Sequence, residues 1–136
     1  MDLDQIYEAC KALIVPYVRG ATSGEAGRAV FDVTKETPSD YYIASKGNFE
    51  VPPGRKTKEI GFAGVAKRKD SIAFHFVPVY MDPPLGEKLS PVLMKRSSGK
   101  GCFQFKTWDE ELAAAVADAL EKGLDCYEER GWVARG

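Results

Sequence analysis

The chain is poor in the residues that build metal centres and nucleophilic sites. It has a single histidine, His75, and its three cysteines, Cys10, Cys102 and Cys126, lie far apart. A zinc site needs three or four His, Cys or carboxylate ligands, usually in closely spaced pairs, and a disulfide framework needs an even set of cysteines. The sequence therefore argues against both and predicts reduced, structural thiols.

Long apolar runs are also missing. No stretch approaches the roughly 18 consecutive apolar residues of a membrane-spanning helix, and the start Met1-Asp2-Leu3-Asp4 is acidic rather than a basic segment before an apolar run. The length of 136 residues and the hydrophobic content of 44% suit one domain over residues 1–136. We expect a soluble, cytoplasmic protein that does not associate with membranes.

An excess of charge of one sign is lacking as well, since the net charge is −1 and the pI is about 5.9. This balance argues against a nucleic-acid partner, which favours a strongly basic domain. The charges are nevertheless uneven, because residues 46–106 hold 12 lysines and arginines against 5 acidic residues. The basic middle predicts either an anion-binding surface or basic strands neutralised by acidic helices.

Two segments have the spacing of amphipathic helices. Apolar residues recur at steps of three and four along residues 3–17, which predicts a helix there. Near the C-terminus, Thr107 and Glu110 have the spacing of a capping box, which predicts a helix over residues 108–122. Gly123 should stop or bend this second helix.

The region between the helices alternates apolar and polar residues, as strands do. Strands are predicted over residues 29–34, 39–44, 59–66, 71–78 and 102–106, with a short helix over residues 91–96 and a small-residue connector over residues 20–27. The first two strands should form a hairpin, and the third and fourth should pair antiparallel through a tight polar turn. Residues 46–58 contain two glycines and two prolines and predict a loop.

These elements predict an α+β fold, in which an antiparallel sheet of about five strands carries the N- and C-terminal helices on one face. Alternation assigns the large residues to the helix-facing side: Ile60, Phe62, Ile72, Phe74, Phe76, Phe103 and Phe105. The opposite side then receives Gly61, Ala63, Val65, Ala73, His75, Val77, Cys102, Gln104 and Lys106.

The opposite side combines small residues with a few hydrogen-bonding side chains, so another body could approach it closely. The candidate ligand-binding residues are His75, Cys102, Gln104 and Lys106, with Tyr80 and Lys100 at the rim. The expected occupant is a small anionic ligand or a protein partner, and a homodimer through this face or a sheet edge is also open. The alternative is a purely structural role, in which a neighbouring segment covers the face and His75 only forms a hydrogen bond with a backbone carbonyl.

Catalysis is the weaker expectation for the same residues. His75 and Cys102 could be neighbours across the sheet, but the flanking sequence does not resemble a cysteine hydrolase. His75 acting as a general base on an anionic metabolite remains an alternative. We therefore expect a binding module without a catalytic residue, and no cofactor.

The first helix begins with carboxylates, Asp2, Asp4 and Glu8. Oxygen ligands of this kind could attract a hard cation, although acids at a helix N-terminus are expected in any case because they stabilise the helix dipole.

Several motifs together resemble the YdhG-like family, a domain of unknown function numbered 1801. The resemblance rests on the run from Glu36 to Tyr42, the strand from Ile72 to Pro83, the segment from Leu89 to Arg96 and the block from Gly99 to Lys106. It implies a frataxin-like α+β domain with two helices on a sheet. Because some relatives are described as intracellular iron chaperones, it also implies iron at the acidic edge of the first helix and a protein partner at the exposed sheet face.

Overall fold

The protein is described by a computed structural model covering residues 2–19, 30–51, 54–99 and 101–133. The described residues include an antiparallel sheet, whose strands lie in the order β1-β2-β3-β4-β6-β5. The strands are β1 (Asp32–Thr37), β2 (Asp40–Val51), β3 (Arg55–Lys67), β4 (Ile72–Phe76), β5 (Ser97–Gly99) and β6 (Cys102–Phe105). The predicted α+β class is confirmed, with six strands instead of about five.

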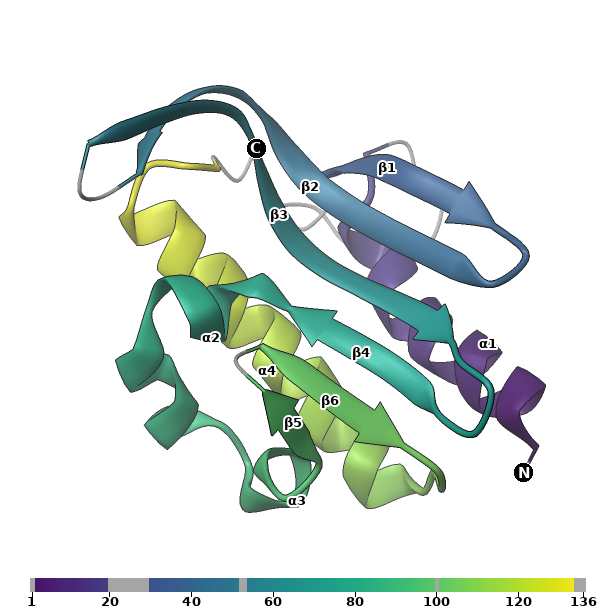
Figure 1. Ribbon diagram of the computed structural model, residues 1–136. Coiled ribbons are helices and arrows are strands. Elements are labelled where there is room, and N and C mark those ends of the chain that lie inside the picture. The colour runs from purple at the N-terminus through teal and green to yellow at the C-terminus, as the bar shows by residue number, and fades with distance from the viewer. Residues whose placement is uncertain (1, 20–29, 52–53, 100, 134–136) are drawn as a thin grey trace.

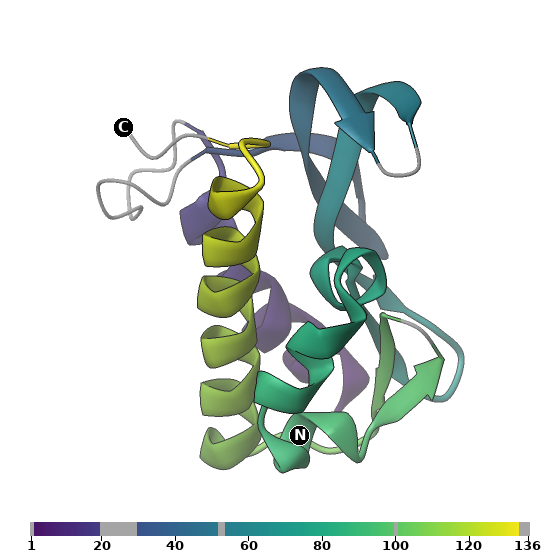
Figure 2. The same ribbon diagram turned by 90° about the vertical axis from the view of Figure 1, so that its left-hand side faces the viewer.

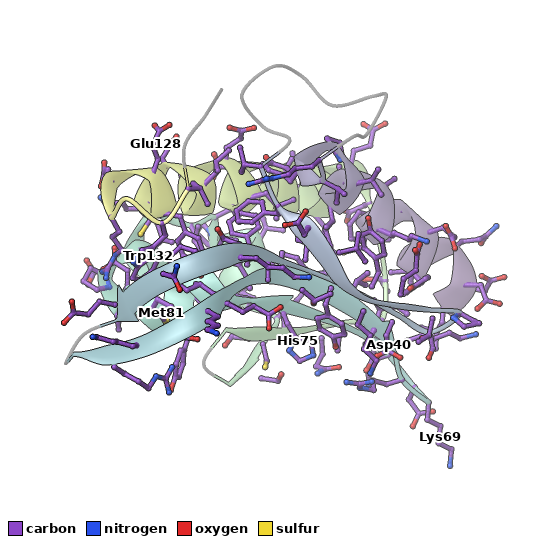
Figure 3. The ribbon with its side chains drawn as sticks, turned by 90° about the horizontal axis from the view of Figure 1, so that it is seen from above. Asp40, Lys69, His75, Met81, Glu128 and Trp132 are labelled. Carbon is purple, nitrogen blue, oxygen red and sulfur yellow. The ribbon has the colours of Figure 1, made fainter. Side chains whose placement is uncertain are left out.

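Two long helices form a second layer on one face of this sheet (Figures 1 and 3). They are α1 (Leu3–Ile14), which continues into the 3-10 turn η1 (Val15–Tyr17), and α4 (Glu110–Glu129). The short helices α2 (Val77–Met81), η2 (Pro83–Lys88) and α3 (Pro91–Met94) follow β4 and lie beside α4 (Figure 2). Within the described part of the chain, the other sheet face carries no helix (Figure 3).

The helix starts follow from capping residues. Asp2 caps α1 by accepting a hydrogen bond from the backbone N–H of Gln5, and the Gln5 side-chain oxygen accepts one from the backbone N–H of Asp2. In α4 the cap is Asp109, which accepts from the N–H of Leu112 at 2.8 Å. The prediction that Thr107 caps this helix was therefore wrong, because an aspartate two residues later takes that position.

Gly123 lies inside α4, which continues to Glu129, so the prediction that it stops the helix was also wrong. Its missing side chain serves packing instead. A Cβ at this position would come within 2.6 Å of the Phe76 ring and 2.8 Å of Pro78. The glycine thus lets α4 lie close against the end of β4 and the start of α2.

The strands β2 and β3 are much longer than predicted. The expected loop over residues 46–58 is two paired strands, which approach a turn containing Gly54 at φ +115°. Left-handed backbone of this kind suits glycine. Strand pairing continues as far as Val51 and Arg55, on either side of this turn. The predicted connector over residues 20–27 lies outside the described residues. The predicted strand over residues 71–78 ends at Phe76, where Val77 and Pro78 begin α2.

A β-bulge in β3 sets which residues face the helices. Ile43 pairs with Ala63 but the next residue, Ala44, pairs with Gly61, so Phe62 is an extra residue on β3. Phe62 stacks on Phe31 at 4.1 Å between ring centroids, on the helix side. Beyond the bulge the alternation is reversed.

Because of this reversal, the assignment of Ala63 and Val65 to the open face was wrong. Cross-strand partners point to the same face, and these two residues pair with Phe76 and Phe74 in the buried core. The open face receives Gly64 and Ala66 instead, opposite His75 and Ala73.

Candidate functional site

The open face is organised around a row of residues that runs across five strands. Lys35 pairs with Tyr42, Tyr42 with Gly64, Gly64 with His75, and His75 with Cys102. Since directly paired residues share a face, these five side-chain positions form one line from β1 to β6. Gly64 at the centre has no side chain, and the Tyr42 ring lies over it.

A second row lies beside the first, nearer the turn between β3 and β4. Asp40 pairs with Ala66, Ala66 with Ala73, and Ala73 with Gln104. Two alanines thus continue the small-residue surface of Gly64. We call Gly64, Ala66 and Ala73 the floor of the site: all three are buried, and polar side chains surround them on the strands to either side.

His75 and Cys102 make the closest contact in the site. The imidazole Nδ1 lies 3.3 Å from the Cys102 Sγ, and the Tyr42 ring lies 5.6 Å from the imidazole between centroids. Burial lowers the pKa of His75 below its ordinary value of 6.5; the Arg68 guanidinium lowers that pKa further, while the Asp40 carboxylate opposes this. A neutral imidazole therefore prevails at pH 7 and can offer one hydrogen-bond donor and one acceptor.

Arg68 brings a positive charge to the site from the turn that follows β3. Its guanidinium lies 3.7 Å from Asp40, whose carboxylate is also 3.9 Å from the Lys35 ammonium. Hydrogen bonding from the Ser39 hydroxyl holds the Asp40 pKa below its usual range, with help from Thr37 and the two cations. Two cations thus share one ionised carboxylate, which leaves the rim with one positive charge in excess.

Gln104 is fixed by its neighbours. Its side-chain oxygen accepts a hydrogen bond from the Ser71 hydroxyl at 2.6 Å, and its amide nitrogen donates to the Ser98 hydroxyl at 3.4 Å. The half-buried carboxamide is therefore held in one orientation beside the floor. Lys106 is exposed just beyond the end of β6.

Of the six predicted ligand-binding residues, the sheet brings together His75, Cys102 and Gln104. Lys100 lies outside the described residues. Tyr80 lies on α2, where its side chain is 58% exposed and lines a cavity at the β5–β6 edge rather than the two rows.

The three acidic residues of the first helix have separate roles. Asp2 caps α1, the Asp4 carboxylate pairs with the Lys67 ammonium, and Glu8 is exposed. Across the described residues, no group of three or more His, Cys, Asp or Glu side chains could hold a metal ion.

Sequence reasoning missed Tyr42, Gly64 and Arg68 as site residues. Arg68 was read as part of a polar turn, and its reach toward Asp40 has no local signature. Gly64 and Tyr42 depend on the bulge at Phe62, because simple alternation places Gly64 on the helix side. A glycine among larger β3 residues was the available signal, since such glycines often mark a bulge or a close approach.

Comparison with known proteins leaves the chain without a close reference. No protein-family model matches it, and searches of curated proteins and of solved structures also give no match. In the part of the chain that the structure describes, no helix has the length and apolar character needed to cross a membrane.

Proposed function

We propose that this protein is a non-catalytic binding module that takes a small anionic ligand on its open sheet face. One observation carries the proposal: Arg68, His75 and Gln104 gather on one face around the small residues of the floor, with the Tyr42 ring over Gly64. These groups supply hydrogen-bond donors and a guanidinium that suits carboxylates and phosphates.

The state of the His75–Cys102 pair favours binding over nucleophilic catalysis. An activated thiolate next to an imidazolium requires a histidine that holds a proton readily, whereas the surroundings lower the His75 pKa. Within the described chain, no third side chain orients His75 by a hydrogen bond to Nε2, as a catalytic triad would require. A neutral His75 beside the Cys102 sulfur fits a hydrogen-bonding role.

The proposed setting is the cytoplasm. The support is that all three cysteines are unpaired, which suits a reducing compartment.

The resemblance to the YdhG-like family remains a proposal beside this one, supported by its motifs and by the arrangement of two terminal helices on one face of an antiparallel sheet. Iron delivery, the alternative that this resemblance implies, has less support. Asp2 and Asp4 already cap α1 and neutralise Lys67, so a cation would have to compete for them.

The test is a two-dimensional amide NMR titration with inorganic phosphate and, separately, succinate. We expect saturable shifts centred on Gly64, His75 and Gln104, and about tenfold weaker binding in Arg68→Gln, because a hydrogen bond to a charged group contributes roughly 1.5–3 kcal/mol. Lys46→Gln, which removes one exposed lysine from β2, is the charge-matched control and should bind like the wild type.

Absence of site-centred shifts with both anions would overturn the anion proposal. So would shifts that persist unchanged in Arg68→Gln. Light scattering on the same samples measures the molecular mass and so detects a homodimer. A homodimer through the open face would bury the same residues and block the ligand.

A further inference from the structure

A cavity of about 800 Å³ lies on the other side of the β5–β6 edge, away from the rows on the open face. Its walls come from five regions that are distant in sequence: the β2–β3 hairpin tip, α2 with η2, α3, the β5–β6 hairpin and the end of α4. In Figure 1 these elements follow one side of the molecule, from the β2–β3 hairpin tip and the end of α4 at the top, past α2, to β5 and α3 at the bottom. Its size is in the range of about 300–1,000 Å³ that is typical of small-molecule pockets.

Apolar side chains line much of this cavity without being fully buried. Met81 and Met94 are half-buried, and Tyr80 is the exposed large hydrophobic residue of the described chain, at 58%. Leaving such surfaces in water is unfavourable. Methionines also adapt their shape to different apolar partners, so these walls suit a flat apolar group.

Two arginines add positive charge to the same cavity. Arg55 forms no ion pair with the described residues. Arg130 lies over the Trp132 ring at 5.1 Å, and its guanidinium is 3.7 Å from the Asp82 carboxylate. A guanidinium has five N–H donors, so Arg130 retains donors after this contact and is held in place by the indole beneath it.

We propose that this cavity binds a small amphipathic anion: a flat, apolar or aromatic body seated among Tyr80, Met81 and Met94, with an acidic headgroup on Arg55 and Arg130. The site is separate from the open face, where the ligand-contacting groups are polar and the floor offers little apolar surface. The two sites therefore select different anions.

The probe is 8-anilinonaphthalene-1-sulfonate, an aromatic anion whose fluorescence rises when water is excluded. We expect saturable binding to the folded protein, and about tenfold weaker binding in Arg55→Gln, since a charged hydrogen bond is lost. Lys69→Gln removes the same charge at the β3–β4 turn, far from the cavity (Figure 3), and should bind like the wild type. N-phenyl-1-naphthylamine, which lacks the sulfonate, should bind with an affinity that Arg55→Gln does not change.

Arg130→Gln is a second variant, and thermal unfolding shows whether each variant is folded. Amide NMR shifts caused by the sulfonate probe should fall on Val79, Met94 and Phe103. The proposal is overturned if the folded protein shows no saturable binding, if neither arginine variant that remains folded weakens it, or if the shifts centre on Gly64 and His75. Loss of phosphate binding in Arg68→Gln concerns only the open face, so the two proposals fail independently.

Discussion

The ring of Tyr42 lies directly over Gly64 on the neighbouring strand, so closely that a Cβ at residue 64 would be 1.9 Å from its Cδ1 atom. The aromatic ring covers backbone that the glycine leaves bare. The same ring then borders His75 at 5.6 Å between centroids. Gly64 therefore determines where Tyr42 lies, and Tyr42 in turn forms one wall of the candidate site.

Gly64→Ala should destabilise the protein by about 1–3 kcal/mol, because the new methyl group forces the Tyr42 ring out of place. In a Tyr42→Ala background the same substitution should cost much less, since the clashing ring is absent. Urea unfolding of the two single variants and the double variant gives the coupling energy. Additive effects would show that the two residues do not constrain each other.

The cap of α4 gives a second prediction. Asp109→Ala should lower the free energy of unfolding by about 1 kcal/mol, because the N–H of Leu112 loses its acceptor. Thr107→Ala should have a much smaller effect, although sequence spacing points to that residue. Urea unfolding of both variants decides between them, and an equal loss would return Thr107 to the capping role.

Cys10 and Cys102 should differ sharply in the rate at which iodoacetamide modifies them. Cys10 is fully buried, and burial raises its pKa far above that of a free thiol, whereas Cys102 is half-buried at the open face. Iodoacetamide should modify Cys102 first in the native protein, and Cys10 only as the protein unfolds. Mass spectrometry of timed samples identifies the modified residue, and rapid modification of Cys10 would contradict the described core. Cys102→Ser should remove the fast phase.

Stability should fall as the pH drops from about 7 to 5. The folded protein holds the His75 pKa below 6.5, so in this range the unfolded chain binds more protons and protonation favours unfolding. Burial and then the Arg68 guanidinium oppose the imidazolium, and Asp40 only partly compensates. His75→Asn should flatten the dependence of urea unfolding on pH. A wild-type protein whose stability rises between pH 7 and 5 would show that the surroundings favour the charged imidazole.

Much of the fold could be predicted because apolar residues recur at regular intervals along its helices and strands. The helical stripe of α1 and the alternation of β4 and β6 placed Ile6, Phe74 and Phe103 in the core and His75 on the open face. These residues lie in elements without irregularity, where spacing alone determines the face.

The failures come from single residues whose roles depend on tertiary contacts. Gly123 has the propensity of a helix stop, but its place in α4 is set by the Phe76 ring packed against it. Similarly, Asp109 and Thr107 are both reasonable caps by composition, and only the chain path into α4 selects Asp109. Arg68 comes close to the other site residues only in the folded chain, and no pattern in the neighbouring sequence indicates this.

Because Phe62 is an extra residue, the alternation of core-facing and open-face side chains along β3 shifts by one residue at this point. A substitution scan that follows simple alternation along this strand would treat Ala63 and Val65 as surface positions and Gly64 as core, the reverse of their places. Large residues introduced at 64 or 66 would fill the floor, whereas polar ones at 63 or 65 would enter the core. Removing Phe62 itself would bring β3 back into regular alternation with Ala63 still opposite Ile43 and Gly64 still opposite Tyr42, so both faces would keep their residues and the core would lose one aromatic ring.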